Sequence, residues 1–275
     1  MKRGAVDIAV IIPSTGRQTL FASLSSVFDQ DLTPKEIVVV DDSKEQKINF
    51  QPRTNLRLIK TGGGRGPSSA RNLGIASTKS SIVAFLDDDD IWLKNHLSTS
   101  IEKMEEFDLD AIISSAITHK GVRPKKLLSG EKDPLIEVYG GIRYLNSPYY
   151  LPLPGLMVKR EVTNHISFNE RLRDREDLWF IHKIFEFGFR IQQSNSTTVK
   201  IHDNYSRKIF RSNLDANIKW FYRLMTIDRT AAKKFIKYIA IRNELLRANI
   251  RNVIKLLKLS SSVKSIHNPQ LLIQD

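Results

Sequence analysis

Four consecutive aspartates at residues 87–90 are the densest group of metal-binding side chains in the sequence. Adjacent carboxylates repel one another, and each raises its neighbour's pKa unless water or a cation screens the charge. Oxygen ligands of this kind suit Mg²⁺ or Mn²⁺, which often share their site with substrate phosphates. A solvated acidic turn is the alternative, since runs of charge are usually surface loops. The choice between the two depends on the surrounding chain.

The segments before the aspartates predict an α/β sheet. Residues 5–12 and 36–40 are short β-branched runs with apolar residues on both faces, typical of strands covered by helices on each side. Between them, residues 17–30 have apolar side chains at helical spacing, and residues 56–59 suit a third strand. The chain therefore opens as strand, helix, strand, strand.

A glycine-rich loop at residues 61–66 runs into a helix that Pro67 should begin and that should end near Ser77. Residues 82–86 then form the strand that carries the aspartates, followed by a helix over 95–107 and a strand over 111–117. Ligands of open α/β sheets bind beyond the carboxyl ends of the strands. The aspartates, and the carboxylates that follow residue 40, stand at such ends.

The second half of the chain has weaker patterns. Residues 119–154 carry Gly, Pro and Lys without clean periodicity and are predicted to be loop-rich. Residues 175–187 are predicted to be helical, 190–193 and 197–202 to be strands, and 214–259 to be largely helical.

The amino-acid composition indicates where the protein is located and which kinds of site it can contain. The 275 residues include no cysteine, which excludes disulfides and thiolate zinc sites and favours a cytoplasmic location. No segment suits a membrane span, because Asp7 and Pro13 interrupt the apolar N-terminal run. Lys and Arg outnumber Asp and Glu by 30 to 26 in residues 1–210, but by 13 to 4 in residues 211–275. The basic tail is thus either a packed helical bundle with basic outer faces or a surface for an anionic partner, such as a membrane.

Five motifs, in order, resemble glycosyltransferase family 2, a family of inverting enzymes with the GT-A fold that take sugars from nucleotide diphosphates. They are VIIPS at 10–14, EIVVVDDS at 36–43, GPSSARNLG at 66–74, FLDDDD at 85–90 and REDLW at 175–179. The resemblance covers roughly residues 5–210. It implies a GT-A domain over residues 1–210, with a Rossmann-like mixed central sheet flanked by helices, and a basic, largely helical extension over 211–275.

The resemblance also implies a set of site residues. The nucleotide-sugar would be held by Pro13, Arg17, Asp42, Arg71, Asp87 and Asp88, and a Mn²⁺ or Mg²⁺ ion by Asp89 and His202. Asp177 would be the catalytic base that takes the proton from the acceptor hydroxyl. Four consecutive aspartates leave open which of them meets the metal and which meets the ribose, and Asp41 and Asp42 could instead cap the turn that follows with Ser43.

The residues themselves leave alternatives open at several of these positions. Asp177 stands at a predicted helix start, where the helix dipole favours the carboxylate, but it could simply cap that helix, and Glu176 competes for the role of base. His202 could be a hydrogen-bonded surface residue. Arg207 and Lys208 could clamp the diphosphate or form a solvated basic turn.

The expected function is metal-dependent, inverting transfer of a sugar from a nucleotide diphosphate, with UDP as the expected nucleotide, to a hydroxyl of a glycan or lipid-linked acceptor in cell-surface polysaccharide synthesis. The enzyme would be cytoplasmic, with peripheral contact to the inner face of the membrane through the basic tail. The sequence departs from the family pattern in the expected nucleoside pocket, where Thr15 and Gly16 replace the aromatic residue and Asn of many members.

Two other functions agree with part of the sequence. A sugar nucleotidyltransferase would need a glycine-rich phosphate loop with Arg and Lys directly after the first strand, where residues 13–17 read Pro-Ser-Thr-Gly-Arg. A basic nucleic-acid-binding module fits the net charge of +13, but four aspartates in the cleft would repel phosphate, so no nucleic-acid partner is expected.

Overall fold

The computed structural model describes residues 6–45, 48–49, 53–141, 149–172, 174–202, 214–246, 249–264, 266 and 269–272. The chain divides into two compact units. The first comprises Met1–Gly130 and Leu151–Asp203, and the second comprises Glu131–Tyr150 and Asn204–Asp275. The segment 131–150 thus groups with the C-terminal helices.

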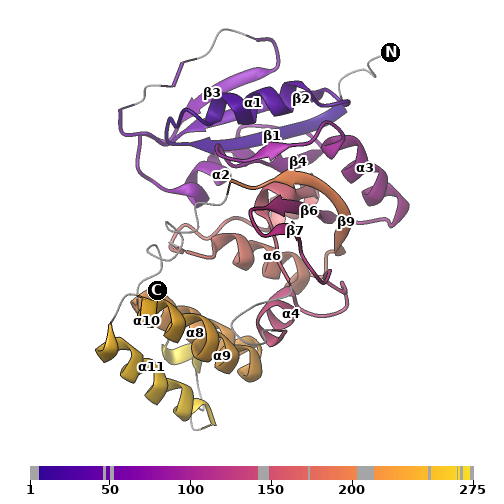
Figure 1. The fold of residues 1–275 in the computed structure, drawn as a ribbon. Helices are drawn as coiled ribbons and strands as arrows, with labels where there is room; N and C mark the ends of the chain where they lie inside the picture. The colour runs from indigo at the N-terminus through magenta and orange to yellow at the C-terminus, as the bar shows by residue number, and fades with distance from the viewer. Residues whose placement is uncertain are drawn as a thin grey trace. The chain divides into compact units, whose positions relative to one another are not determined.

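The first unit is built on a mixed, nine-stranded sheet with the order β3-β2-β1-β4-β8-β6-β9-β5, in which β7 pairs with β6 (Figure 1). Strands β3, β2, β1 and β4 are parallel, so their carboxyl ends lie at one edge. The apolar run 8–12 is fully buried, as expected for a strand covered on both faces. The strands are β1 Val6–Ser14, β2 Pro34–Asp41, β3 Leu56–Lys60, β4 Ile82–Phe85, β5 Ile91–Trp92, β6 Ala111–Thr118, β7 Gly121–Arg123, β8 Leu156–Lys159 and β9 Ile191–Lys200.

Helices pack on this sheet, and one of them depends on a glycine for its close approach. Helix α2 lies against β1 and β2. A Cβ atom on Gly74 would be 2.5 Å from Ile11 Cγ2, so only glycine lets the helix lie this near the strand. The helical elements of this unit are α1 Leu20–Phe28, α2 Pro67–Ala76, α3 His96–Glu106, the 3₁₀ turn η1 Leu153–Gly155, α5 Arg160–His165 and α6 Glu176–Glu186.

The second unit is helical and has its own aromatic core. Trp220 and Phe235 are buried there, and the ring of Tyr139 packs edge-on against both at centroid distances of 6.3 and 5.3 Å. Within the described residues, each helix falls short of the length or the hydropathy that spanning a bilayer requires. The elements are α4 Pro134–Gly140, α8 Leu214–Ile227, α9 Arg229–Phe235, the π-helix η2 Ile236–Ala240, α10 Ile241–Leu246, α11 Ile250–Ser261, and the 3₁₀ turns η3 Ser262–Lys264 and η4 Pro269–Leu272.

The structure corrects several predicted elements. The region 119–154 is not only loop, because it contains β7 and helix α4. Asp133 caps α4 by accepting from the Leu135 N–H at 2.8 Å, a signal that the many Gly, Pro and Lys residues around it obscured. The two strands expected at 190–193 and 197–202 are one strand, β9. Strands β5 and β8 and helix α5 were not predicted, because each is too short to show a repeating pattern of apolar residues.

Candidate active site

The aspartates follow β4, and hydrogen bonds tie them to the end of β1. The Ser14 hydroxyl donates to Asp88 Oδ2 at 2.6 Å, and Arg17 Nη1 donates to Asp88 at 2.9 Å and to Asp89 at 2.7 Å. Burial raises the pKa of Asp88, an effect opposed by Ser14 and Arg17 and increased by the charges of Asp89 and Asp87. The acidic run is therefore a structured cluster that basic and hydroxyl groups hold in place, and not a solvated turn.

Asp42 organises the glycine-rich loop. Its carboxylate accepts from the Thr61 hydroxyl, from the Arg65 N–H at 2.9 Å and from the Gly66 N–H at 2.7 Å. The loop needs glycine, because a Cβ atom on Gly63, at φ 94°, would lie 2.9 Å from backbone atoms. Asp42 thus connects the end of β2 to the start of α2.

The neighbouring carboxylate, Asp41, makes a separate and local set of contacts. It accepts from the N–H and the hydroxyl of Ser43, so Asp41 caps the turn that follows β2.

Arg71 joins two motifs that are far apart in the sequence. Its guanidinium donates to Asp87 at 2.7 Å and to Glu176 at 3.2 Å, and its side chain is 5% exposed. Phe168 lies beneath it, with the guanidinium carbon 5.3 Å from the ring centroid. Burial alone would lower the pKa of Arg71, but the two carboxylates outweigh it and raise the pKa. The arginine is thus a permanent cation at the centre of the site.

Asp177 is the second residue of α6, directly after Glu176. Helix α6 follows Arg175, which adopts a left-handed conformation (φ 63°, ψ 25°) that residues other than glycine rarely take. Burial, followed by the charge of Glu176, raises the pKa of Asp177 to about 7, against the opposing effects of the Leu178 N–H and Arg71. The predicted dipole stabilisation of its carboxylate is therefore outweighed. Its side chain remains partly exposed, so a substrate hydroxyl can reach it.

Carboxylate oxygens are the ligands that hard cations such as Mg²⁺ and Mn²⁺ prefer. Asp87 and Asp89 each give one oxygen to an arginine, at Arg71 and Arg17 respectively. Among the described residues no group of three or more Asp, Glu or His side chains converges on one point. One or two carboxylates completed by substrate phosphates are a common arrangement for Mg²⁺, so the residues present fit a metal held together with a diphosphate.

His202 lies at the edge of the described chain. Its backbone N–H donates to Asp90 Oδ1 at 2.7 Å and its side chain is exposed. Asp90 therefore attaches the residues after β9 to the acidic run, a structural role. Arg207 and Lys208 lie outside the described residues.

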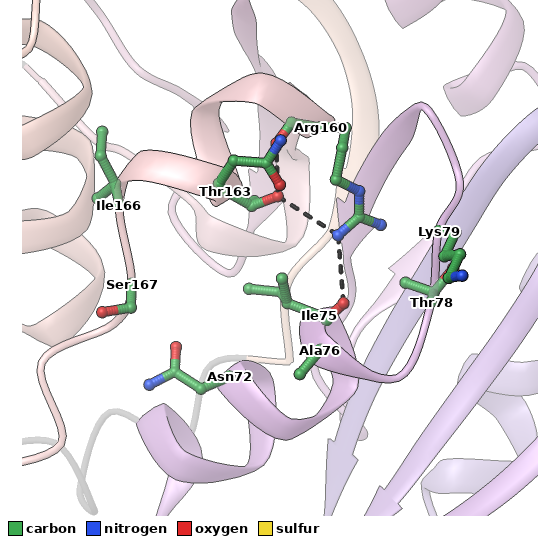
Figure 2. A pocket seen from close by; sticks show the side chains of 10 residues that line it. Asn72, Ile75, Ala76, Thr78, Lys79, Arg160, Thr163, Ile166 and Ser167 are labelled. Carbon is green, nitrogen blue, oxygen red and sulfur yellow. Dashed lines mark hydrogen bonds between the residues drawn. The ribbon is translucent and has the colours of Figure 1, made fainter.

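A cavity of about 460 Å³ opens elsewhere, where the end of α2 meets α5 (Figure 2). Arg160 fills one side of it, donating to the carbonyl oxygens of Ile75 at 3.2 Å and Ser80 at 2.9 Å. None of the predicted site residues lines it. The lining residues are Asn72, Ile75, Ala76, Thr78, Lys79, Arg160, Thr163, Asn164, Ile166 and Ser167.

Three contacts in the site were not predicted from the sequence. Ser14 stands in the first motif, yet nothing in the pattern assigns it to Asp88. Thr61 opens the glycine-rich loop, and a hydroxyl residue before glycines was the available signal for its contact with Asp42. Phe168 belongs to no motif, and only the fold brings it beneath Arg71.

Known proteins share both sequence and fold with this chain. The model of a family described as Glycosyl transferase family 2 matches residues 9–206. The UDP-Glc:alpha-D-GlcNAc-diphosphoundecaprenol beta-1,3-glucosyltransferase WfgD of Escherichia coli is 29% identical over 44% of this chain and 52% of its own length. The GalNAc(5)-diNAcBac-PP-undecaprenol beta-1,3-glucosyltransferase of Campylobacter jejuni is 25% identical over 73% of this chain and 70% of its own. The match thus spans about half of the first of these relatives.

Solved structures share the fold at low sequence identity. The S. aureus TarS fragment 1–349 in complex with UDP-GlcNAc aligns with a TM-score of 0.63 and 19% identity, over 93% of this chain and 81% of that one. The same fragment in another crystal structure aligns with a TM-score of 0.55 and 18% identity, over 94% and 91%. This likeness concerns the fold, and it confirms the predicted mixed α/β sheet with C-terminal helices.

Proposed function

Because this chain belongs to glycosyl transferase family 2, we propose that it transfers a sugar from a UDP-linked donor to a hydroxyl of a lipid-linked glycan, with inversion at the anomeric carbon. Family membership confirms the resemblance seen in the motifs and the expected enzyme class, and it favours that class over the nucleotidyltransferase and nucleic-acid-binding alternatives. The product would enter a cell-surface polysaccharide made at the inner face of the membrane.

The observation that carries the proposal is the position of Arg71 between Asp87 and Glu176. One side of this arginine touches the acidic run, which suits a nucleotide diphosphate, and the other touches the residue beside Asp177. A donor-binding group and a candidate base therefore belong to one electrostatic network. We assign this chemistry to the unit formed by Met1–Gly130 and Leu151–Asp203.

The names of the relatives support the donor and acceptor classes. The Escherichia coli relative is named for UDP-glucose and a diphosphoundecaprenol-linked sugar, and the Campylobacter jejuni relative for an undecaprenol-linked glycan. A diphosphate-bearing lipid acceptor would also match the excess of Lys and Arg in residues 211–275.

In the proposed reaction Asp177 accepts the proton of the acceptor hydroxyl as that oxygen attacks the anomeric carbon and the bond to the nucleoside diphosphate breaks. A base with a pKa of about 7 is matched to neutral pH. Arg71 and Arg17 neutralise charge near the acidic run, and Asp42 keeps the loop in place for the nucleotide together with Pro13, Asp87 and Asp88. A Mn²⁺ or Mg²⁺ ion at Asp89 and His202 would stabilise the departing diphosphate.

Titration calorimetry with UDP-, GDP- and dTDP-sugars, each with and without Mn²⁺, tests the proposal. We expect a UDP-sugar to bind, and more tightly with Mn²⁺. Asp89→Asn should remove the metal dependence, whereas Asp31→Asn, a control on an exposed aspartate, should retain it. A folded protein that binds no nucleotide-sugar under any condition would contradict the proposal.

A further inference from the structure

Helix α11 exposes a row of large aliphatic side chains. Ile250, Ile254 and Leu257 are 69%, 48% and 50% exposed. At 3.6 residues per turn, their spacing places all three within about 60° of the helix circumference. Scattered exposed apolar residues are normal, but a continuous row on one helix marks a surface that contacts something apolar.

The helix that bears this row is packed and capped. A neighbouring sector of the helix, about 60–120° around its circumference from Ile250, buries Val253 and Leu256 in the second unit. Asn249 caps its first turn, and the Asn252 amide donates to Glu244 at 2.8 Å. The exposed row is therefore a fixed feature of the fold, and its three side chains are separate residues from the two that are buried.

Positive charge lies beside the row. Arg251, Lys255 and Lys258 occupy the sector next to it, roughly 80–140° around the helix from Ile250. The sequence from 245 to 274 contains five Lys and Arg residues and no Asp or Glu. An aliphatic stripe bordered by cations is the pattern of a helix that lies in the interface of a membrane.

We propose that the exposed face of α11 docks on a membrane surface that contains anionic phospholipids, with Ile250, Ile254 and Leu257 entering the acyl boundary and the three cations contacting lipid phosphates. The biological purpose of this contact rests on the proposed function, because a lipid-linked acceptor is held in such a membrane. A second copy of the chain is a poorer occupant, since pairing two α11 faces would bring their cations together. Nucleic acid would leave the aliphatic row exposed.

Co-sedimentation of the full chain with phosphatidylcholine vesicles, with and without phosphatidylglycerol, tests this directly. We expect binding to the anionic vesicles and much weaker binding to the neutral ones. Lys255→Glu/Lys258→Glu should lower the partition coefficient about 25-fold or more, because one lysine near an anionic surface contributes roughly fivefold. Ile254→Ser/Leu257→Ser should lower it at least about tenfold through lost apolar burial.

Matched controls come from exposed residues of the first unit. Lys94→Glu/Lys125→Glu makes the same change of charge, and Val122→Ser/Phe187→Ser removes two exposed apolar side chains. Both controls should bind vesicles as the unmodified chain does, and circular dichroism should show every variant folded. Equal losses in the controls would overturn the proposal.

Three further outcomes would also overturn the proposal. They are wild-type binding that does not distinguish anionic from neutral vesicles, no vesicle binding at all, and α11 variants that change only self-association measured by light scattering. UDP-sugar calorimetry on the same samples separates this test from the proposed function. Nucleotide binding without vesicle binding refutes only the docking surface, and the reverse refutes only the proposed donor.

Discussion

Replacing Asp177 by asparagine should stabilise the fold at neutral pH, even though it removes the proposed base. The folded pKa of Asp177 is about 7, against an ordinary value of 3.8. Between these values the folded state binds more protons than the unfolded state, so the contribution of Asp177 to stability falls as pH rises through this window and is constant above it. Asparagine has no charge to bury. The advantage of Asp177→Asn should therefore be near zero at pH 4, grow up to pH 7 and then level off.

The pKa difference sets the size of this effect. At about 1.4 kcal/mol per pKa unit, the shift corresponds to at most about 4 kcal/mol. Asp177 is partly exposed, and water screens part of the penalty. We therefore expect the variant to gain on the order of 2 kcal/mol in the free energy of unfolding at pH 8.

Urea unfolding of both proteins at intervals from pH 4 to pH 8 measures the effect, since other groups titrate alike in each and cancel in the difference. Asp215→Asn is the matched control, because Asp215 also lies in the first turn of a helix but is 74% exposed. Its difference from wild type should vary little with pH. A flat difference for Asp177→Asn across this range, or a loss of stability at pH 8, would refute the electrostatic account of the site.

Three other substitutions test the residues that hold the site and its glycine-rich loop in place. Arg71→Met leaves Asp87 and Glu176 without their shared cation, so it should lower the free energy of unfolding, measured with urea, by about 3 kcal/mol and weaken donor binding. A variant as stable as the wild type would show that these ion pairs are not buried as described. Gly74→Ala places a Cβ atom 2.5 Å from Ile11 and should lower the free energy of unfolding, measured by thermal unfolding, by about 1–3 kcal/mol. The control Gly140→Ala, whose Cβ would be 3.9 Å from its nearest neighbouring atom, should be neutral or stabilising. Asp42→Asn turns an acceptor of three hydrogen bonds into a partial donor and should weaken nucleotide binding about tenfold in calorimetry while the protein stays folded; unchanged affinity would remove the glycine-rich loop from the donor site.

The sequence predicted where the site lies, because three of its five motifs stand at the ends of strands. The apolar runs at 8–12 and 36–40 require burial on both faces, which makes them central strands and brings the residues after them to one edge of the sheet. Residues 82–85 form a strand parallel to these two, so Asp42 and Asp87 follow strands that end at the same edge of the sheet. The capping role of Asp41 also follows from local geometry.

The parts that the sequence did not predict depend on long-range contacts. The ion pair of Arg71 with Glu176 joins residues 105 positions apart, and neither residue type signals the other. The raised pKa of Asp177 depends on burial and on the Glu176 charge, whereas local reasoning saw only the helix dipole. Helix α4 was missed because Gly, Pro and Lys residues around Asp133 obscured its cap.

The most direct test of the central claim compares donor binding with sugar transfer in Asp177→Asn. UDP-sugar affinity is measured by calorimetry, and transfer by UDP release with an undecaprenyl diphosphate-linked sugar as the acceptor. We predict that the wild-type protein transfers sugar, and that Asp177→Asn binds the UDP-sugar with wild-type affinity but no longer transfers the sugar. The control Asp215→Asn should retain both donor binding and transfer. A variant that transfers sugar at the wild-type rate would contradict the assignment of Asp177 as the base.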